Sequence, residues 1–155
     1  MNKDTIASII TSAKRSHKTW LENARSLVEG MPLDKEQVPV NSTDCQFGKW
    51  YYGEGQALKA MINFKEIEGH HDALHQTYRE IFVLLFVEGD KKASLFSRFF
   101  GKAQKSSKEN EKLARDKLQV LEQQSKTIMK KLDELERMVV GMSEEQINSY
   151  INKRS

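Results

Sequence analysis

Four side chains in the first half of the 155-residue chain have the chemistry of transition-metal ligands. His71 and His75 are four residues apart in a segment that predicts a helix, so their imidazoles lie one turn apart on one face. Two imidazoles placed in this way can hold one metal ion, but two ligands alone bind it weakly. His70, which lies beside them, is expected on the surface.

The other two candidates are His17 and Cys45, the only cysteine of the chain. His17 lies in the apolar row of a predicted first helix. Cys45 lies at the start of a predicted short helix, where a thiolate also feels the positive end of the helix dipole. If these faces converge on the histidine pair, the site has three imidazole nitrogens and one sulfur, a set that zinc accepts in tetrahedral geometry. Each residue also has a structural explanation, because a core histidine is more often hydrogen-bonded and a lone buried cysteine often packs as a small hydrophobe.

The elements that must position these residues are predicted to be helices. Apolar residues at three- and four-residue steps predict a first helix over residues 3–29, which ends near Gly30. A loop follows over residues 31–43. A short helix, capped by one of residues 42–44, then carries Cys45 towards a glycine-rich turn.

A third helix is predicted from Leu58 or Phe64 to Glu88, and Gly69 is a place where it can kink or split. From Lys91 onward the chain has no proline and is rich in helix formers, which favours one very long fourth helix. Its first part has an aromatic stripe, Phe96, Phe99 and Phe100. No segment has the two-residue period of a strand, so we predict an all-α fold, most simply an antiparallel four-helix bundle.

The fourth predicted helix has a heptad row of apolar residues after residue 113. Its members are Ala114, Leu118, Leu121, Ser125, Ile128, Leu132, Leu135, Val139 and Met142. This row predicts either a coiled-coil-like extension or a helix laid against its own bundle. We expect a bundle over residues 1–125 and a helical extension over residues 126–155. A capping box at residues 143–146 predicts a last short helix.

The composition excludes several other classes of protein. A single cysteine cannot form an internal disulfide, and the longest apolar stretch, residues 81–87, is far below the ~20 residues of a membrane span. Charges occur throughout residues 1–30, where a secretory signal would be apolar. The net charge of +3 arises after residue 100 and suits a solvated helix face, so nucleic acid is not an expected partner. We predict a cytoplasmic protein without membrane insertion.

Three motifs of the chain resemble those of the chemoreceptor zinc-binding (CZB) domain family. Residues 45–51 have the pattern Cys-x-Phe-Gly-x-Trp-Tyr, residues 17–20 have His-x-x-Trp, and residues 71–75 have His-x-x-x-His. They occur in the family's order and at similar separations, and the resemblance covers roughly residues 5–125. It implies a zinc site made by His17, Cys45, His71 and His75. The family's usual signalling hairpin or cyclase does not follow, so the chain resembles a stand-alone member or a fragment.

The resemblance implies a zinc-binding sensory or regulatory module rather than an enzyme, because four protein ligands leave no open position for substrate. A zinc-bound thiolate at Cys45 is open to hypochlorite or peroxide, and its release would pass a change to a chemoreceptor or cyclic-dinucleotide signalling partner. A purely structural zinc site in a docking module is the alternative. A zinc hydrolase using Asp72 as base, and a di-iron site using Glu68, are further and weaker alternatives.

A homodimer is also expected from the heptad row. One bundle of ~120 residues has little need of an apolar seam after residue 113, and an exposed seam favours pairing with a second copy. On this expectation, charged residues in place of Leu121 and Leu132 would break the dimer and leave zinc bound.

Overall fold

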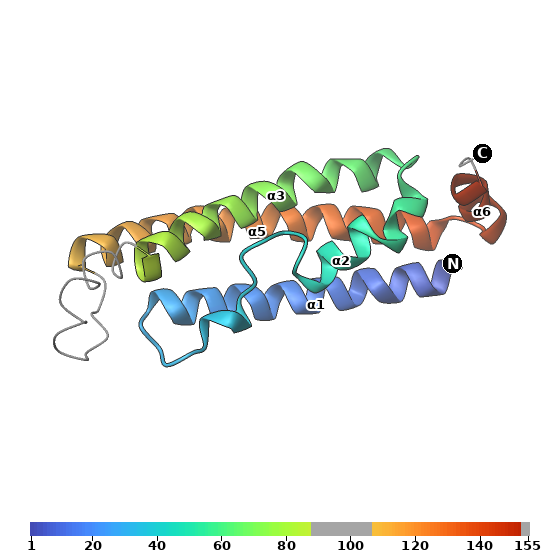
Figure 1. Cartoon of the computed structure of the whole chain (residues 1–155). Helices are drawn as coiled ribbons and strands as arrows, with labels where there is room; N and C mark the ends of the chain where they lie inside the picture. The colour runs from blue at the N-terminus through green and yellow to red at the C-terminus, as the bar shows by residue number, and fades with distance from the viewer. Residues whose placement is uncertain (88–106, 153–155) are drawn as a thin grey trace.

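The structure is a computed structural model, and it describes residues 1–87 and 107–152. These residues form the α-helices α1 (Lys3–Val28), α2 (Gln46–Tyr52), α3 (Ile62–Phe82), α5 (Lys108–Gly141) and α6 (Glu144–Asn152) (Figure 1). Short 3-10 helices occupy Lys35–Gln37 and Glu54–Leu58, and one π-helical turn, Val83–Val87, continues α3. The described residues contain no strand, which confirms the all-α prediction.

Helices α1 and α3 both pack along α5, which runs antiparallel to them, and the short α2 lies against α1 (Figure 1). Two ion pairs between α1 and α5 are consistent with this antiparallel register. Lys14 pairs with Asp133 on α5 at 2.9 Å, and Arg25 pairs with Glu122 at 2.8 Å. These ion pairs therefore agree with opposite directions of α1 and α5, and an antiparallel four-helix bundle with α2 as its short member stays a prediction.

Helix α1 ends as predicted, because Gly30 takes a positive φ of 78° just after it. Helix α3 starts at Ile62 and continues through Gly69, so it is not split there. The first part of the predicted fourth helix, including its aromatic stripe, lies outside the described residues. From Lys108 onward the prediction of one long helix is confirmed.

The heptad row of α5 is buried within the chain's own bundle. Its buried members are Ala114, Leu118, Leu121, Ser125, Ile128, Leu132, Leu135 and Val139. The apolar ones belong to the same core cluster as residues of α1 and α3. The row therefore packs inside the chain's own bundle, which is one of its two predicted roles, and the homodimer stays a prediction without support from this row. The division expected at residue 125 stays a prediction.

The two ends of the described chain meet at one end of the bundle (Figure 1). The predicted capping box is confirmed, since Ser143 and Gln146 exchange bonds of 2.8 and 3.2 Å between side chain and backbone at the start of α6. The backbone N–H of Lys3 donates to the carboxylate of Glu144 at 3.2 Å. The Lys3 ammonium donates to the carbonyl of Met142 at 3.3 Å, just past the last turn of α5.

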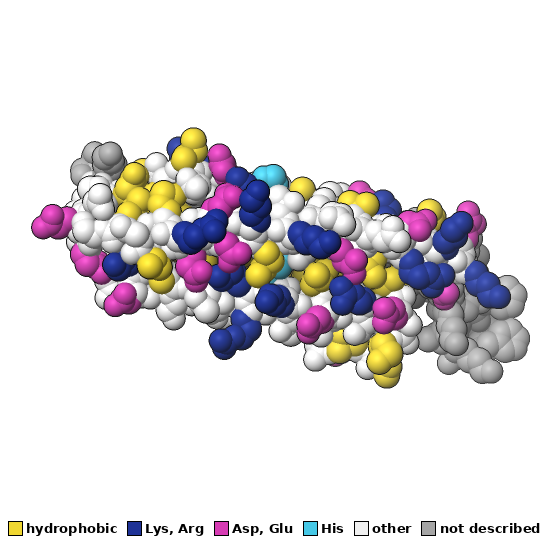
Figure 2. All heavy atoms as spheres, turned by 180° about the vertical axis from the view of Figure 1, so that it is seen from behind, with side chains coloured by type: hydrophobic (Ala, Val, Ile, Leu, Met, Phe, Trp, Pro, Cys, Tyr) yellow, Lys and Arg dark blue, Asp and Glu magenta, His cyan; other side chains and the backbone are white. Residues whose placement is uncertain are grey.

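The surface carries charges of both signs. Figure 2 shows lysine and arginine side chains interspersed with aspartate, glutamate and apolar side chains over one face. Among the described residues, no helix is both long and apolar enough to cross a lipid bilayer.

Candidate metal centre

Cys45 is itself the N-cap of α2, so the prediction that one of residues 42–44 caps this helix is wrong. Its Sγ accepts a hydrogen bond from the backbone N–H of Gly48 at 3.2 Å. The thiol also lies 3.3 Å from the carbonyl oxygen of Ser42, to which it can donate. The sulfur thus takes the place that a serine or aspartate oxygen usually fills at a helix start. This position directs the sulfur towards α3 rather than into solvent.

Gly48 explains how the loop reaches the start of α2. A Cβ atom at this position would lie 1.7 Å from the carbonyl oxygen of Ser42, which leaves no room for any other residue without a backbone shift. The glycine of the Cys-x-Phe-Gly pattern is therefore required by the close approach of the loop that holds Cys45. The sequence motif encodes a backbone contact as well as a ligand.

Helix α3 presents both histidines of the predicted pair to the interior. His71 and His75 are 3% and 4% exposed, while His70 is exposed as expected. Nδ1 of His75 lies 3.0 Å from the carbonyl oxygen of Val40, so as an N–H donor it leaves Nε2 available for a metal. Nε2 of His71 lies 3.3 Å from the sulfur of Cys45. Each imidazole therefore has one nitrogen aimed at a common point.

The ligand atoms of Cys45, His71 and His75 all lie within 4.8 Å of one another. Ligands around one zinc ion at about 2.0–2.3 Å lie roughly 3.3–3.6 Å apart, so small side-chain movements bring the three atoms into this geometry. One sulfur and two imidazole nitrogens suit zinc and are a poor set for magnesium or calcium, which prefer oxygen. The chemistry of the donor set thus fits a zinc ion, which these residues would hold between α2 and α3.

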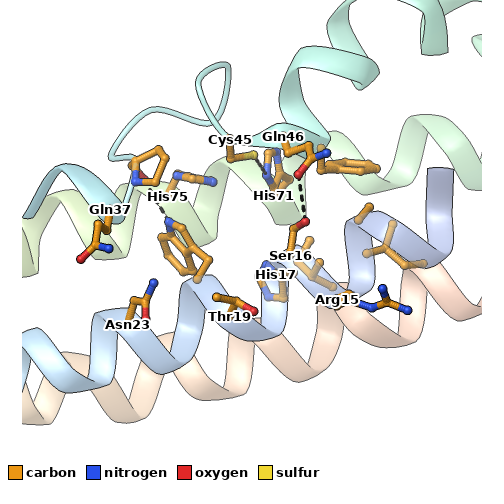
Figure 3. Close-up of a pocket in the computed structure, with 16 residues that line it drawn as sticks. Arg15, Ser16, His17, Thr19, Asn23, Gln37, Cys45, Gln46, His71 and His75 are labelled. Atoms are coloured by element: carbon orange, nitrogen blue, oxygen red, sulfur yellow. Dashed lines mark hydrogen bonds between the residues drawn. The ribbon is translucent and has the colours of Figure 1, made fainter. Parts of the chain in front are cut away.

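His17 lines the same cavity of about 370 Å³ as these three residues, from the α1 side (Figure 3). Its nitrogens do not belong to the group of mutually close ligand atoms. Instead, Nε2 of His17 lies 2.9 Å from the hydroxyl of Ser125 on α5. The structure therefore brings three of the four predicted ligands together and places the fourth beside them with a different partner.

Aromatic rings pack around the site and hold the loop that precedes α2. The ring of Trp20 lies 5.0 Å from that of His75, and its Nε1–H donates to the carbonyl of Pro39 at 3.1 Å. The ring of Phe47 contacts His71 edge-on at 5.2 Å. These contacts restrict the histidine rotamers and anchor the loop from α1 as well as from α3.

Burial sets the protonation of the site. It lowers the pKa of His17 to about 4 and that of His71 to about 3, with the neighbouring His75 adding to both shifts. Burial also lowers the pKa of His75. Nδ1 of His71 is buried without a hydrogen-bond partner among the described residues, which further disfavours an imidazolium there. The histidines are therefore neutral at pH 7, which is the form that binds metal.

Burial has the opposite consequence for Cys45, because it raises the pKa of this thiol. The N–H groups of Gly48 and Phe47 oppose the shift by donating to the sulfur. Without a metal the thiol is therefore protonated at pH 7, and metal binding has to displace this proton. The sulfur is the one ligand whose protonation state changes on binding at neutral pH.

The acidic side chains of the two weaker alternatives lie outside the site. Asp72 is exposed and accepts a hydrogen bond of 3.2 Å from the hydroxyl of Tyr52. Glu68 is also exposed, and neither belongs to the group of close ligand atoms. The positions of Asp72 and Glu68 therefore do not support the hydrolase or the di-iron alternative.

One thiol and two imidazoles gathered inside a helical bundle define a metal-binding domain of the cysteine–histidine class. The family model described as "Chemoreceptor zinc-binding domain" (CZB) matches residues 17–82, which include all four predicted ligands. The resemblance found in the sequence is therefore confirmed over this segment, and zinc is the metal that this family binds. No curated protein and no solved structure gives a significant match to the chain.

Sequence reasoning did not assign a role to Ser125 or to the carbonyl of Val40, although both bond to histidines of the site. Ser125 had a detectable signal, because it is the one hydroxyl in an otherwise apolar heptad row. The carbonyl of Val40 had none, because any residue supplies a backbone carbonyl and only the folded loop places it.

Proposed function

We propose that the chain is a zinc-binding sensory module in which His17, Cys45, His71 and His75 bind one zinc ion. The observation that carries the proposal is the group of three ligand atoms within 4.8 Å, located in the segment that matches the CZB family. His17 completes the set from the same cavity. Four protein ligands close a tetrahedral site, so the module acts by binding rather than by catalysis.

On this proposal, the stimulus that the module senses is zinc availability or an oxidant. As a zinc ligand, Cys45 stays deprotonated and remains a nucleophile. Hypochlorite converts the thiolate to a sulfenic acid and is itself reduced to chloride, which removes the sulfur from the ligand set. The cavity beside Cys45, and its partial exposure, support access for a small oxidant.

On this proposal, the module responds to loss of zinc by a structural rearrangement around α2. Cys45 is both the ligand and the N-cap of this seven-residue helix, so loss of the metal contact also loosens the start of α2. The change then passes to a signalling partner of the chemoreceptor or cyclic-dinucleotide type. The proposal also includes a homodimer, although the heptad row does not support it. A cytoplasmic location is likewise part of the proposal.

The deciding experiment measures zinc content and the zinc dissociation constant of the purified chain, before and after hypochlorite. We expect one zinc per chain, loss of zinc on oxidation, and weak binding in Cys45→Ala. His70→Ala is the matched control, because this exposed imidazole adjoins a proposed ligand and should leave binding unchanged.

Two other results would redirect the proposal. Zinc that neither oxidant nor chelator removes from folded protein indicates the structural alternative, in which the metal only supports a docking module. Less than about half an equivalent of zinc, or lost binding in His70→Ala, contradicts the assigned ligand set.

A further inference from the structure

Ser125 is the one hydroxyl-bearing residue in the buried row of α5, whose residues are all described. It is 4% exposed, between a turn that carries Leu121 and a turn that carries Ile128. A buried hydroxyl that lacks a hydrogen bond is destabilising, so its partner matters. That partner is Nε2 of His17, at 2.9 Å. The one polar residue of the row is therefore hydrogen-bonded to a proposed zinc ligand.

Two histidines of the site have such partners, and the consequences differ. His75 bonds to the carbonyl of Val40 through Nδ1, and one of its ring nitrogens belongs to the group of close ligand atoms. This bond supports metal binding by orienting the ring. His17 bonds to Ser125, and neither of its nitrogens belongs to that group. The Ser125 bond thus holds His17 away from the other ligands instead of orienting it towards them.

The ring of His17, rather than its helix, has to move for this ligand to join the others. Ion pairs on both sides, Lys14 with Asp133 and Arg25 with Glu122, hold α1 in register with α5. His17 as a whole residue is only partly buried, and its imidazole borders the cavity (Figure 3). The side chain can therefore exchange partners while the helices stay in place.

We propose that Ser125 is a positioning residue that competes with zinc for His17. The inference rests on the proposed ligand set and adds a determinant of its affinity. Zinc binding by His17 breaks its hydrogen bond to Ser125. The zinc dissociation constant therefore includes the free energy lost with that hydrogen bond. Ser125, 108 positions from His17 in sequence, thereby lowers the zinc affinity of the site, and its hydrogen bonding changes when zinc binds.

The test is a set of zinc affinities measured on the full chain by competition with a chelator. Ser125→Ala removes the competing hydrogen bond, and we expect zinc binding to tighten by roughly 2- to 10-fold. His17→Gln should weaken zinc binding. In the His17→Gln background, Ser125→Ala should have no further effect, because the competition no longer exists.

Each contrary result has a separate meaning. If Ser125→Ala weakens binding, the hydroxyl orients His17 and the inference is wrong. If Ser125→Ala changes affinity equally with and without His17, it acts through bundle packing, and the inference is again wrong. If His17→Gln leaves zinc affinity unchanged, the proposed four-ligand set itself fails.

A spectroscopic measurement separates competition from simple packing. Imidazole ¹⁵N shifts of His17, recorded with and without added zinc, report the partner of each nitrogen. We expect the hydrogen-bonded signal of Nε2 to be lost when zinc binds. Retention of that signal in the zinc-loaded chain would overturn the inference.

Discussion

On the α2–α3 side of the site, Cys45, His71 and His75 already point at a common position, whereas on the α1–α5 side His17 points at Ser125. The first side is held by the loop that precedes α2, through the carbonyls of Val40 and Ser42. The second side is held by the packing of two long helices. The difference teaches that three of the ligands are positioned by the loop and by α2 and α3, whereas His17 is positioned by contacts between α1 and α5. Substitutions on the two sides should therefore change zinc affinity and stability in different proportions.

The largest effect is expected from the α1–α5 side, in Leu121→Ala. This side chain is 0% exposed in the chain's own core, so its truncation should cost about 2–5 kcal/mol of unfolding free energy. The zinc affinity of the folded chain should change little, because Leu121 does not line the cavity that contains the proposed ligands. Urea unfolding of the chelator-treated chain and zinc titration measure the two effects.

A control for the Leu121→Ala result is protein concentration. The unfolding midpoint should not depend on it, because the heptad row packs within one chain. A midpoint that rises with concentration would show that a second copy covers this row after all.

The converse perturbation is Gly48→Ala, on the α2–α3 side. The new methyl group meets the backbone carbonyl of Ser42, so the start of α2 must shift. We expect a loss of about 1–3 kcal/mol in stability and a 10- to 100-fold weaker zinc affinity, since the sulfur moves with the helix start. Zinc affinity equal to that of the unsubstituted chain would show that the loop does not position Cys45.

Proton release on zinc binding sharpens the comparison between the sulfur and the imidazoles. Because burial raises the pKa of Cys45 and lowers those of the histidines, only the thiol carries a displaceable proton at pH 7. Calorimetry in buffers of different ionisation enthalpy should give about one proton per zinc, and about none for Cys45→Ala.

The same measurement at pH 6 tests the direction of the histidine shifts. The pKa values of His17 and His71, about 4 and about 3, leave these two imidazoles neutral at this pH, and burial lowers the pKa of His75 as well, so the count should remain between about one and two. Histidines at their usual pKa of about 6.5 would be largely protonated at pH 6, and the count would rise to about three. The higher count would contradict burial of these imidazoles in the metal-free chain.

The smallest effect is expected for Gly69→Ala, which is the matched glycine control for Gly48→Ala. A Cβ at Gly69 meets nothing within 4 Å, and the residue lies in the middle of α3. Alanine should therefore stabilise the chain by about 0.5–1 kcal/mol and leave zinc affinity unchanged. Thermal unfolding would detect the gain. A destabilised variant would indicate that α3 needs a bend at this position.

The parts that could be predicted from sequence are those set by short-range spacing. The four-residue step between His71 and His75 determines their shared face, and Gly30 marks the end of α1, whatever packs against them. The heptad row specifies only that one face of α5 is apolar. It does not specify which helix covers that face, so the chain's own bundle and a second copy fitted it equally well.

Two features of the site depend on contacts that no local pattern contains. Cys45 became the cap of α2 because the carbonyl of Ser42 approaches Gly48, which only the folded loop reveals. The partner of His17 is Ser125, on a helix far along the chain. The types of the four ligand residues were therefore readable from the sequence, but the position of His17 relative to the other three was not.

The contacts between Lys3 and the other end of the chain have a consequence for exchange of backbone hydrogens with solvent. The first turn of a helix has unpaired N–H groups and the last turn has unpaired carbonyls. Here Glu144 accepts from the N–H of Lys3, while the Lys3 ammonium donates to carbonyls at the end of α5. Helix ends normally fray independently, but these two protect each other. Amides in the first turn of α1 and at the α5–α6 junction should therefore exchange at similar rates, and Glu144→Gln should accelerate both together.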